Sequence, residues 1–205
     1  MLHPHTRLQF IDEYIGYGIF ATGFIPAGTI TYVKDALEIE LSSESDILAS
    51  PAYSGYIKKY AYREPSGNHV IGWDLSKYMN HSCNPNTLST GYGFEVAIRD
   101  INPGEHITDD YGMLNIESAM DCTCQQLDCR RQVHPGDMDY MWKRWDRNVK
   151  SALKMLPEVA QPLMELLDTD TYRPLMHYLN TGKNYRSVKV LKYCPPVLTV
   201  ERQGC

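Results

Sequence analysis

Short runs of hydrophobic residues, separated by Gly, Pro and Asn, extend from residue 7 to about residue 112. This pattern is typical of a fold of small β-strands and leaves no room for the alternating strands and helices of a doubly wound sheet. Residues 18–22 and 29–33 are rich in β-branched and aromatic side chains, which predicts two strands. Turn-forming residues occupy 24–28 between them, so we expect a hairpin here.

A later strand is predicted by strict alternation. Phe94, Val96 and Ile98 share one face, and the residues between them are polar or small. Pro and Gly then occupy the two central positions of a turn at 102–105. We expect the returning strand to begin at about Ile107.

Helical periodicity replaces the strand pattern beyond residue 136. Apolar residues recur there at spacings of three and four, which is typical of an amphipathic helix with a buried face. These residues are Met138, Met141, Trp142, Trp145, Val149, Leu153 and Leu156. Pro157 and Pro162 are expected to interrupt this helix, and a second helix is expected over 173–179, ending near Gly182. A short helix is also expected within 42–72.

Composition and charge limit the function. The chain has 205 residues, of which 43% are hydrophobic and 22% charged, and this suits one core-forming domain with an extension. The formal net charge of −5 disfavours sequence-independent nucleic-acid binding, which requires a basic face. No apolar run reaches the roughly 18 residues of a membrane span, and the first residues lack the apolar block of a classical secretory signal. We therefore expect an intracellular protein, cytoplasmic or nuclear.

Three motifs are candidates for chemistry. They are Gly16-Tyr17-Gly18, Asn80-His81-Ser82-Cys83-Asn84-Pro85-Asn86, and His106-Ile107-Thr108-Asp109-Asp110-Tyr111-Gly112. Taken singly, each has an ordinary explanation: a hairpin turn, a loop whose side chains cap their own backbone, and a tyrosine of the core. Their order and spacing along one chain require a common explanation.

In that order and spacing, the motifs resemble the SET-domain family of protein-lysine methyltransferases over about residues 7–131. The resemblance implies a mainly β, β-clip fold of several small sheets, with a pseudoknot formed by the segment 80–86. It implies a SET domain over 1–112, a zinc-binding post-SET segment over 113–135 and a C-terminal helical extension over 136–205. We expect the extension to pack on the SET core, with substrate binding or formation of a homodimer as alternatives.

The resemblance also implies S-adenosylmethionine as the methyl donor. Its expected binding residues are Gly16, Tyr17, Gly18, Asn80, His81 and Tyr111. Tyr111 would in addition be the catalytic tyrosine at the point of methyl transfer. The acceptor would be a lysine side chain of a protein or peptide, with histones among the candidates. The main alternative is an inactive SET module that binds a peptide or protein as an adaptor.

A cysteine cluster indicates a metal site. Three cysteines lie within eight residues: Cys122, Cys124 and Cys129. Their spacing suits a metal better than mutual disulfides, and tetrahedral zinc needs a fourth ligand. The resemblance assigns this place to Cys83, with His134 as a lower-ranked alternative. Small buried hydrophobic cysteines are the ordinary explanation, but the neighbouring residues are polar. Cys194 and Cys205 are expected to take no part.

Two further points remain open at the level of sequence. Asp109 stands where the family usually has Phe or Tyr, two places before the catalytic tyrosine, at a position linked to the number of methyl groups added. The product state is therefore not predicted. A zinc-stabilised adaptor unrelated to methylation would explain the cysteines. It would not explain why the Asn-His-Ser-Cys motif at 80–86 is present.

Overall fold

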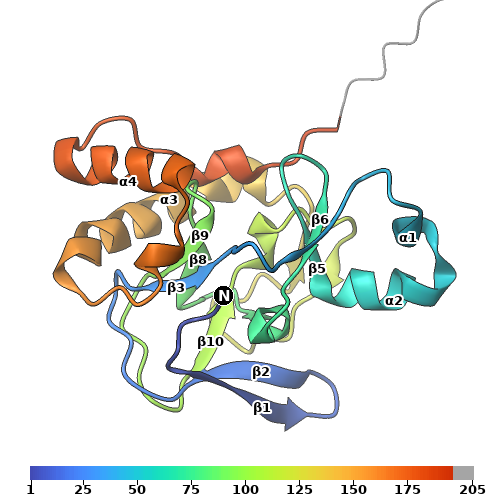
Figure 1. Ribbon diagram of the computed structural model, residues 1–205. Coiled ribbons are helices and arrows are strands. Elements are labelled where there is room, and N and C mark those ends of the chain that lie inside the picture. Colours follow the sequence, from blue (N-terminus) through green and yellow to red (C-terminus); the bar gives the residue numbers. More distant parts are fainter. Residues whose placement is uncertain (196–205) are drawn as a thin grey trace, which may run out of the picture.

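One four-stranded sheet contains residues of all three sequence motifs. The computed structural model describes residues 1–195, in which twelve short strands form four small sheets (Figure 1). The four-stranded sheet comprises, in spatial order, β1 (Thr6–Asp12), β2 (Gly16–Ala21), β10 (His106–Asp109) and β7 (Asn80–His81). β10 pairs antiparallel with β2 and parallel with β7. This sheet thus brings together three segments that are far apart in the sequence.

The other three sheets are antiparallel and equally small. Their strands, in spatial order, are β3 (Ile30–Val33), β9 (Phe94–Ala97) and β8 (Thr87–Ser89); β4 (Ile39–Leu41), β6 (His69–Ile71) and β5 (Ala61–Arg63); and β11 (Met120–Asp121) and β12 (Gln132–Val133). The strands are short because Gly, Pro and Asn interrupt nearly every apolar run.

Strands outnumber helices within residues 1–135, and the C-terminal helices bring the described chain to a mixed content of the two. The α-helices are α1 (Asp46–Ala49), α2 (Pro51–Tyr60), α3 (Met138–Met155) and α4 (Thr169–Thr181). Single 3-10 turns form η1 (Leu75–Tyr78), η2 (Tyr111–Met113), η3 (Leu156–Glu158), η4 (Met164–Leu166) and η5 (Val188–Leu191). The expectation of several small sheets followed by C-terminal helices is confirmed.

Both expected hairpins are wrong, although their strands exist. β2 pairs with β1 and β10, whereas β3 pairs with β9, so the turn at 24–28 carries the chain from one sheet to another. The turn at 102–105 likewise leads from β9 to a different sheet. Its local geometry is as predicted, because Glu105 N–H donates to Asn102 O at 3.0 Å and Gly104 has a φ of 82°. Alternation predicts a strand but not its partner, because pairing depends on the rest of the fold.

The expected C-terminal helices are confirmed with shifted ends. α3 covers the predicted stripe and gives way to η3 at Pro157. α4 begins four residues before the expected start because the Asp168 side chain accepts a hydrogen bond from Thr171 N–H at 2.6 Å. It ends at Gly182, whose φ of 68° is the left-handed conformation that favours glycine. Residues 196–205 of the expected extension, including Cys205, lie outside the described residues.

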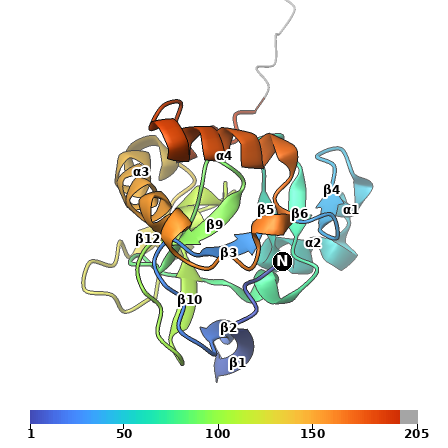
Figure 2. The same cartoon turned by 60° about the vertical axis from the view of Figure 1, so that its left-hand side comes forward.

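The largest hydrophobic core joins the β3-β9-β8 sheet to the C-terminal helices. Phe94 on β9 packs in one cluster with Trp145 and Leu153 on α3 and with Leu175 on α4. Figure 2 shows α3 and α4 lying over this sheet, away from the hairpin of β1 and β2. None of the helices within residues 1–195 has the length and apolar character needed to cross a membrane.

Candidate active site and metal centre

The four-stranded sheet places the three sequence motifs next to one another. Across the β10–β7 pair, Thr108 lies opposite Asn80 and Asp109 lies opposite His81. On the other side of β10, His106 lies opposite Phe20 of β2. The glycine motif at the start of β2, the Asn-His run and the segment leading to Tyr111 are therefore adjacent in space.

Asn80 is held by two contacts that orient its amide. The amide nitrogen donates to Tyr17 O at 2.9 Å and lies 3.4 Å from His106 Nε2. Burial lowers the pKa of His106, so its ring is neutral and its Nε2 can accept. Within residues 1–195 the Asn80 amide oxygen accepts no hydrogen bond, which leaves this oxygen to a ligand. Sequence patterns alone did not indicate this contact of His106.

The two glycines beside Tyr17 are required for different reasons. Gly16 has a φ of 83°, a conformation that a side chain disfavours, and the space around it is open. Gly18 has ordinary backbone geometry. A Cβ atom there would lie 2.6 Å from His106 Nε2 and 2.8 Å from Asn80 Nδ2. Gly18 is thus needed by the close packing of the Asn80 side chain.

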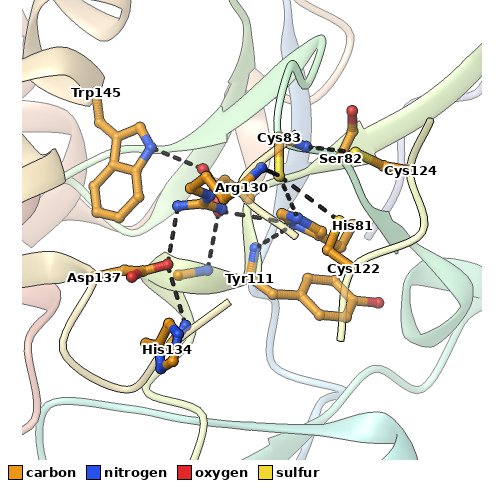
Figure 3. Close-up of polar contacts among 12 residues, drawn as sticks. His81, Ser82, Cys83, Tyr111, Cys122, Cys124, Arg130, His134, Asp137 and Trp145 are labelled. Atoms are coloured by element: carbon orange, nitrogen blue, oxygen red, sulfur yellow. Dashed lines mark hydrogen bonds and ion pairs between the residues drawn. The ribbon is translucent and has the colours of Figure 1, made fainter. Parts of the chain in front are cut away.

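Tyr111 follows β10 and is fixed at both its ring hydroxyl and its main chain. The hydroxyl donates to Met79 O at 2.5 Å, and the N–H donates to His81 Nδ1 at 3.2 Å. Figure 3 shows the Tyr111 and His81 rings next to each other. Burial, followed by the negative charges of Asp109 and Glu95, raises the pKa of Tyr111. Tyr111 therefore keeps its proton and acts as a hydrogen-bond donor.

A cavity of about 940 Å³ opens on one side of Tyr111. Its lining includes Tyr111, Met79, Asp109 and Glu95, together with side chains of α2, β5 and the segment after η2. Among the described residues, the lining excludes the five expected donor-binding residues other than Tyr111: Gly16, Tyr17, Gly18, Asn80 and His81. Tyr111 thus contacts the Asn-His run, through His81, and also lines the cavity.

The four expected cysteines gather at a single point. The Sγ atoms of Cys83, Cys122, Cys124 and Cys129 all lie within 4.8 Å of one another, and those of Cys83 and Cys122 are 3.7 Å apart. Zinc bonded to sulfur at about 2.3 Å in a tetrahedron places its ligands about 3.8 Å apart. The donor set and its spacing therefore fit one zinc ion. The alternative ligand His134 lies outside this group.

Hydrogen bonds to Cys83 connect the metal centre to Tyr111. Because His81 Nδ1 accepts from Tyr111 N–H, the proton of the neutral ring belongs on Nε2, which lies 3.4 Å from Cys83 Sγ and donates to it (Figure 3). Burial lowers the pKa of His81, which favours this neutral form. Arg130 N–H also donates to Cys83 Sγ, at 3.3 Å. Two donors on one sulfur suit a metal-bound thiolate.

Comparison with known proteins agrees with this geometry. The family model described as the SET domain matches residues 16–112. Residues 16–112 form a SET domain.

The curated relatives carry related names. Over 134 residues the chain is 38% identical to histone-lysine N-methyltransferase ASHH3 of Arabidopsis thaliana, an alignment covering 59% of this chain and 36% of that protein. It is 31% identical to histone-lysine N-methyltransferase Set2 of Drosophila melanogaster, covering 59% of this chain and 6% of Set2. The chain thus spans a minor part of these relatives. The methyltransferase domain of human histone-lysine N-methyltransferase SETMAR aligns with a TM-score of 0.42 and 20% identity, covering 64% of this chain and 58% of that one.

One arginine ties the SET domain to the segments that follow it. The Arg130 guanidinium pairs with Asp110, at the end of the domain, and at 3.0 Å with Asp137. Asp110 also accepts a hydrogen bond from Trp145 Nε1 of α3 at 3.0 Å (Figure 3). Both carboxylates are buried, at 2% and 3% side-chain exposure, so the guanidinium is their main compensation. The sequence predicted Trp145 as a core residue but gave no sign of this charge network.

Proposed function

We propose that this protein is a protein-lysine N-methyltransferase that transfers a methyl group from S-adenosylmethionine to a lysine side chain of a protein substrate. The observation that carries the proposal is the position of Tyr111, which contacts His81 at the Asn80 side of the sheet and lines a large cavity. The SET domain and the names of its relatives support the same reaction. Because those relatives are histone-lysine methyltransferases by name, histones are the first candidate substrates and the nucleus is the first candidate location.

In this proposal the donor lies on the side of Tyr111 away from the cavity. The residues that would hold it are Gly16, Tyr17, Gly18, Asn80, His81 and Tyr111. Asn80 fits this role because its amide nitrogen is occupied, which leaves the oxygen to accept from an ammonium group. When bound, S-adenosylmethionine supplies a methyl group activated by the positive sulfur.

The cavity side would receive the lysine. Free lysine has a pKa of about 10.4, so deprotonation at pH 7 costs roughly 4 to 5 kcal/mol. Exclusion of water lowers the pKa of a buried amine, and alignment of the nitrogen with the methyl carbon replaces a bimolecular encounter. The catalytic residue Tyr111 would orient the amine by accepting a hydrogen bond from it, because the hydroxyl proton is donated to Met79 O and fixes the oxygen in place.

The cysteine cluster would hold one structural zinc ion. Cys83 belongs to the Asn-His run, whereas the other three ligands, Cys122, Cys124 and Cys129, follow the SET domain. The ion would therefore join these two segments. We accordingly divide the chain into a SET domain at 1–112, a post-SET zinc segment at 113–135 and a helical extension at 136–205. In this arrangement metal loss loosens the wall of the lysine cavity as well as the segment itself.

The proposal is tested by incubating the zinc-loaded protein with S-adenosylmethionine labelled in the methyl group, histones and a mixed protein extract. Mass spectrometry of the products should map label to lysine side chains. The Asn80→Ala variant is the matched comparison, because it should bind the donor more weakly in calorimetry and transfer less at low donor concentration. A wild-type protein that binds donor yet labels no protein would instead support the inactive adaptor.

A further inference from the structure

Asp109 is a buried acid with no partner. It lies in β10, two residues before Tyr111, with 1% of its surface exposed. Neither carboxylate oxygen has a hydrogen-bond partner within residues 1–195. A buried carboxyl group without compensation costs free energy of folding, and such groups concentrate where function requires them. Asp109 lines the cavity, so an incoming group can meet it there.

Glu95 is a second acid in the lining of the same cavity. It lies in β9, and within residues 1–195 its side chain accepts one hydrogen bond, from the Thr87 hydroxyl at 3.3 Å. Burial raises the pKa of Glu95 to about 7. Burial, and then the charge of Glu95, raises the pKa of Asp109 well above its ordinary value. We call Asp109 and Glu95 the acidic pair.

Nearby cations compensate the acidic pair only in part: the Met1 ammonium opposes the rise in the pKa of Glu95, but burial outweighs it. No ion pair within residues 1–195 involves either member, and Lys34, which lines the same cavity, is paired with Glu40 and Glu64 at 2.7 Å each. Tyr111 cannot replace the pair as a proton acceptor, because its raised pKa keeps the hydroxyl protonated and a neutral phenol is a very weak base. The inner part of the cavity is therefore suited to a cation that carries N–H groups, and an apolar group there would leave both acids unpaired.

We propose that Asp109, with Glu95 beside it, binds the ammonium group of the substrate lysine and takes one proton from it before methyl transfer. This role rests on the proposed function and names its substrate more closely: a primary or partly methylated amine that enters as a cation with an N–H to give. Asp109 is then a second catalytic residue, on the cavity side of Tyr111.

One N–H bond of the ammonium breaks and its proton moves to an Asp109 carboxylate oxygen, leaving the electron pair on nitrogen. That pair forms the bond to the methyl carbon, while the carbon–sulfur bond of the donor breaks and its electrons remain on sulfur as a neutral thioether. The product amine again carries a positive charge, and Asp109 later passes its proton to solvent. A trimethylated lysine has no proton to give and is not a substrate.

The test compares Asp109→Asn with the wild type in single-turnover transfer to a lysine peptide. Loss of the proton acceptor should slow transfer by about 100-fold or more, with donor affinity unchanged in calorimetry. Thermal stability should not fall, because the variant removes an uncompensated buried acid. Glu95→Gln should slow transfer less. Asp139→Asn, which alters an exposed acid that is paired with Lys192 and does not line the cavity, is the matched control and should transfer at the wild-type rate.

A substrate amine of lower basicity distinguishes a role of Asp109 in proton transfer from a role in positioning. In a peptide carrying γ-thialysine, in which sulfur replaces the γ-methylene, the amine loses its proton more easily. The defect of Asp109→Asn should then shrink from about 100-fold to about tenfold. A defect of equal size with both amines would overturn the proton-accepting role, and wild-type transfer by Asp109→Asn would overturn the whole inference while leaving the proposed function standing. Transfer to arginine in place of lysine would overturn the substrate class, and a wild-type protein without any transfer would remove the proposed function itself.

Discussion

The two segments that follow the SET domain are held in place by different physics. In the zinc segment, 113–135, the strands β11 and β12 have two residues each, and the apolar cluster around the cysteines has one fully buried aliphatic residue, Val133. In the helical extension, α3 alone buries six side chains and joins the largest core of the molecule. The zinc segment therefore depends on its ligands, and the extension depends on apolar burial.

Polar contacts follow the same division. The extension continues the edge of β3 through Gln161, whose side chain accepts from Ile30 N–H at 2.9 Å and donates to Gly28 O at 2.8 Å. In the zinc segment the corresponding contacts converge on the sulfur of Cys83. Arg130 is the point where the two systems meet, because it contacts Cys83 through its main chain and Asp137 through its side chain. We therefore expect that the zinc segment can unfold locally while the helical extension stays folded.

Removal of the metal should have the largest effect. Because structural zinc sites contribute on the order of 10 kcal/mol to the folding of the parts they hold, chelation or Cys122→Ser should open residues 113–135. Hydrogen exchange measured by mass spectrometry should show lost protection there, with α3 and α4 still protected. Cys194→Ser, which changes an exposed cysteine outside the cluster, should leave the exchange pattern unchanged. Equal protection of 113–135 with and without chelator would mean that its fold does not require metal.

Arg130→Met should be the most destabilising substitution that leaves the cysteines intact. It removes the guanidinium from the buried carboxylates of Asp110 and Asp137, which should lower the free energy of unfolding by about 3 to 5 kcal/mol in urea titrations. The control is Arg144→Met, which breaks an exposed pair with Asp128 and should cost less than about 1 kcal/mol. Similar losses in the two variants would argue against a central role for Arg130.

Leu153→Ala should weaken the extension by a smaller amount. Leu153 is fully buried on α3, so truncation should lower the free energy of unfolding by about 2 to 4 kcal/mol. Zinc content, measured by atomic absorption, should stay at the wild-type level because the ligands lie in the other segment. Met155→Ala, at a residue 46% exposed on the same helix, should cost less than about 1 kcal/mol. Loss of zinc from Leu153→Ala would show that the two segments do not separate.

A fall in pH should also affect the two segments differently, and this is the smallest of the expected effects. Burial lowers the pKa of His81 from its ordinary value of 6.5, so the folded protein holds this ring neutral while the unfolded chain takes up a proton. The stability due to His81 is therefore complete above about pH 6.5 and is lost as the pH falls through the lowered value. Exchange of residues 113–135 should quicken over this range before that of α3. Replacement of the exposed His134 by Gln should not alter this profile.

Local patterns in the sequence were enough to predict several of the strands and, with the family resemblance, the four cysteines that gather in the structure. β2, β9 and α3 were found from periodicity, and the four cysteines from spacing and the family resemblance. Pairing was not predictable, because neighbouring strands such as β2 and β3 belong to different sheets. The donor-binding residues remain predictions, although they adjoin one another as expected.

Long-range polar contacts were the main feature that the sequence could not disclose. Asp110, Arg130 and Asp137 are separated along the chain, and nothing in their local sequence marks them as partners. Asp109 was recognised as a departure from the family pattern, but its burial and its missing partners emerge only in three dimensions. His106 acts through Asn80, a contact formed by the pairing of β2, β10 and β7.

The central claim is that Tyr111 lies where a methyl group passes from donor to lysine, and Tyr111→Phe tests it most directly. Single-turnover transfer and donor affinity should be measured on the same preparation. Loss of the hydroxyl should reduce transfer by about 100-fold or more, because the fixed oxygen that would orient the amine is removed, while calorimetry gives an unchanged dissociation constant. Transfer at the wild-type rate by Tyr111→Phe would contradict the claim.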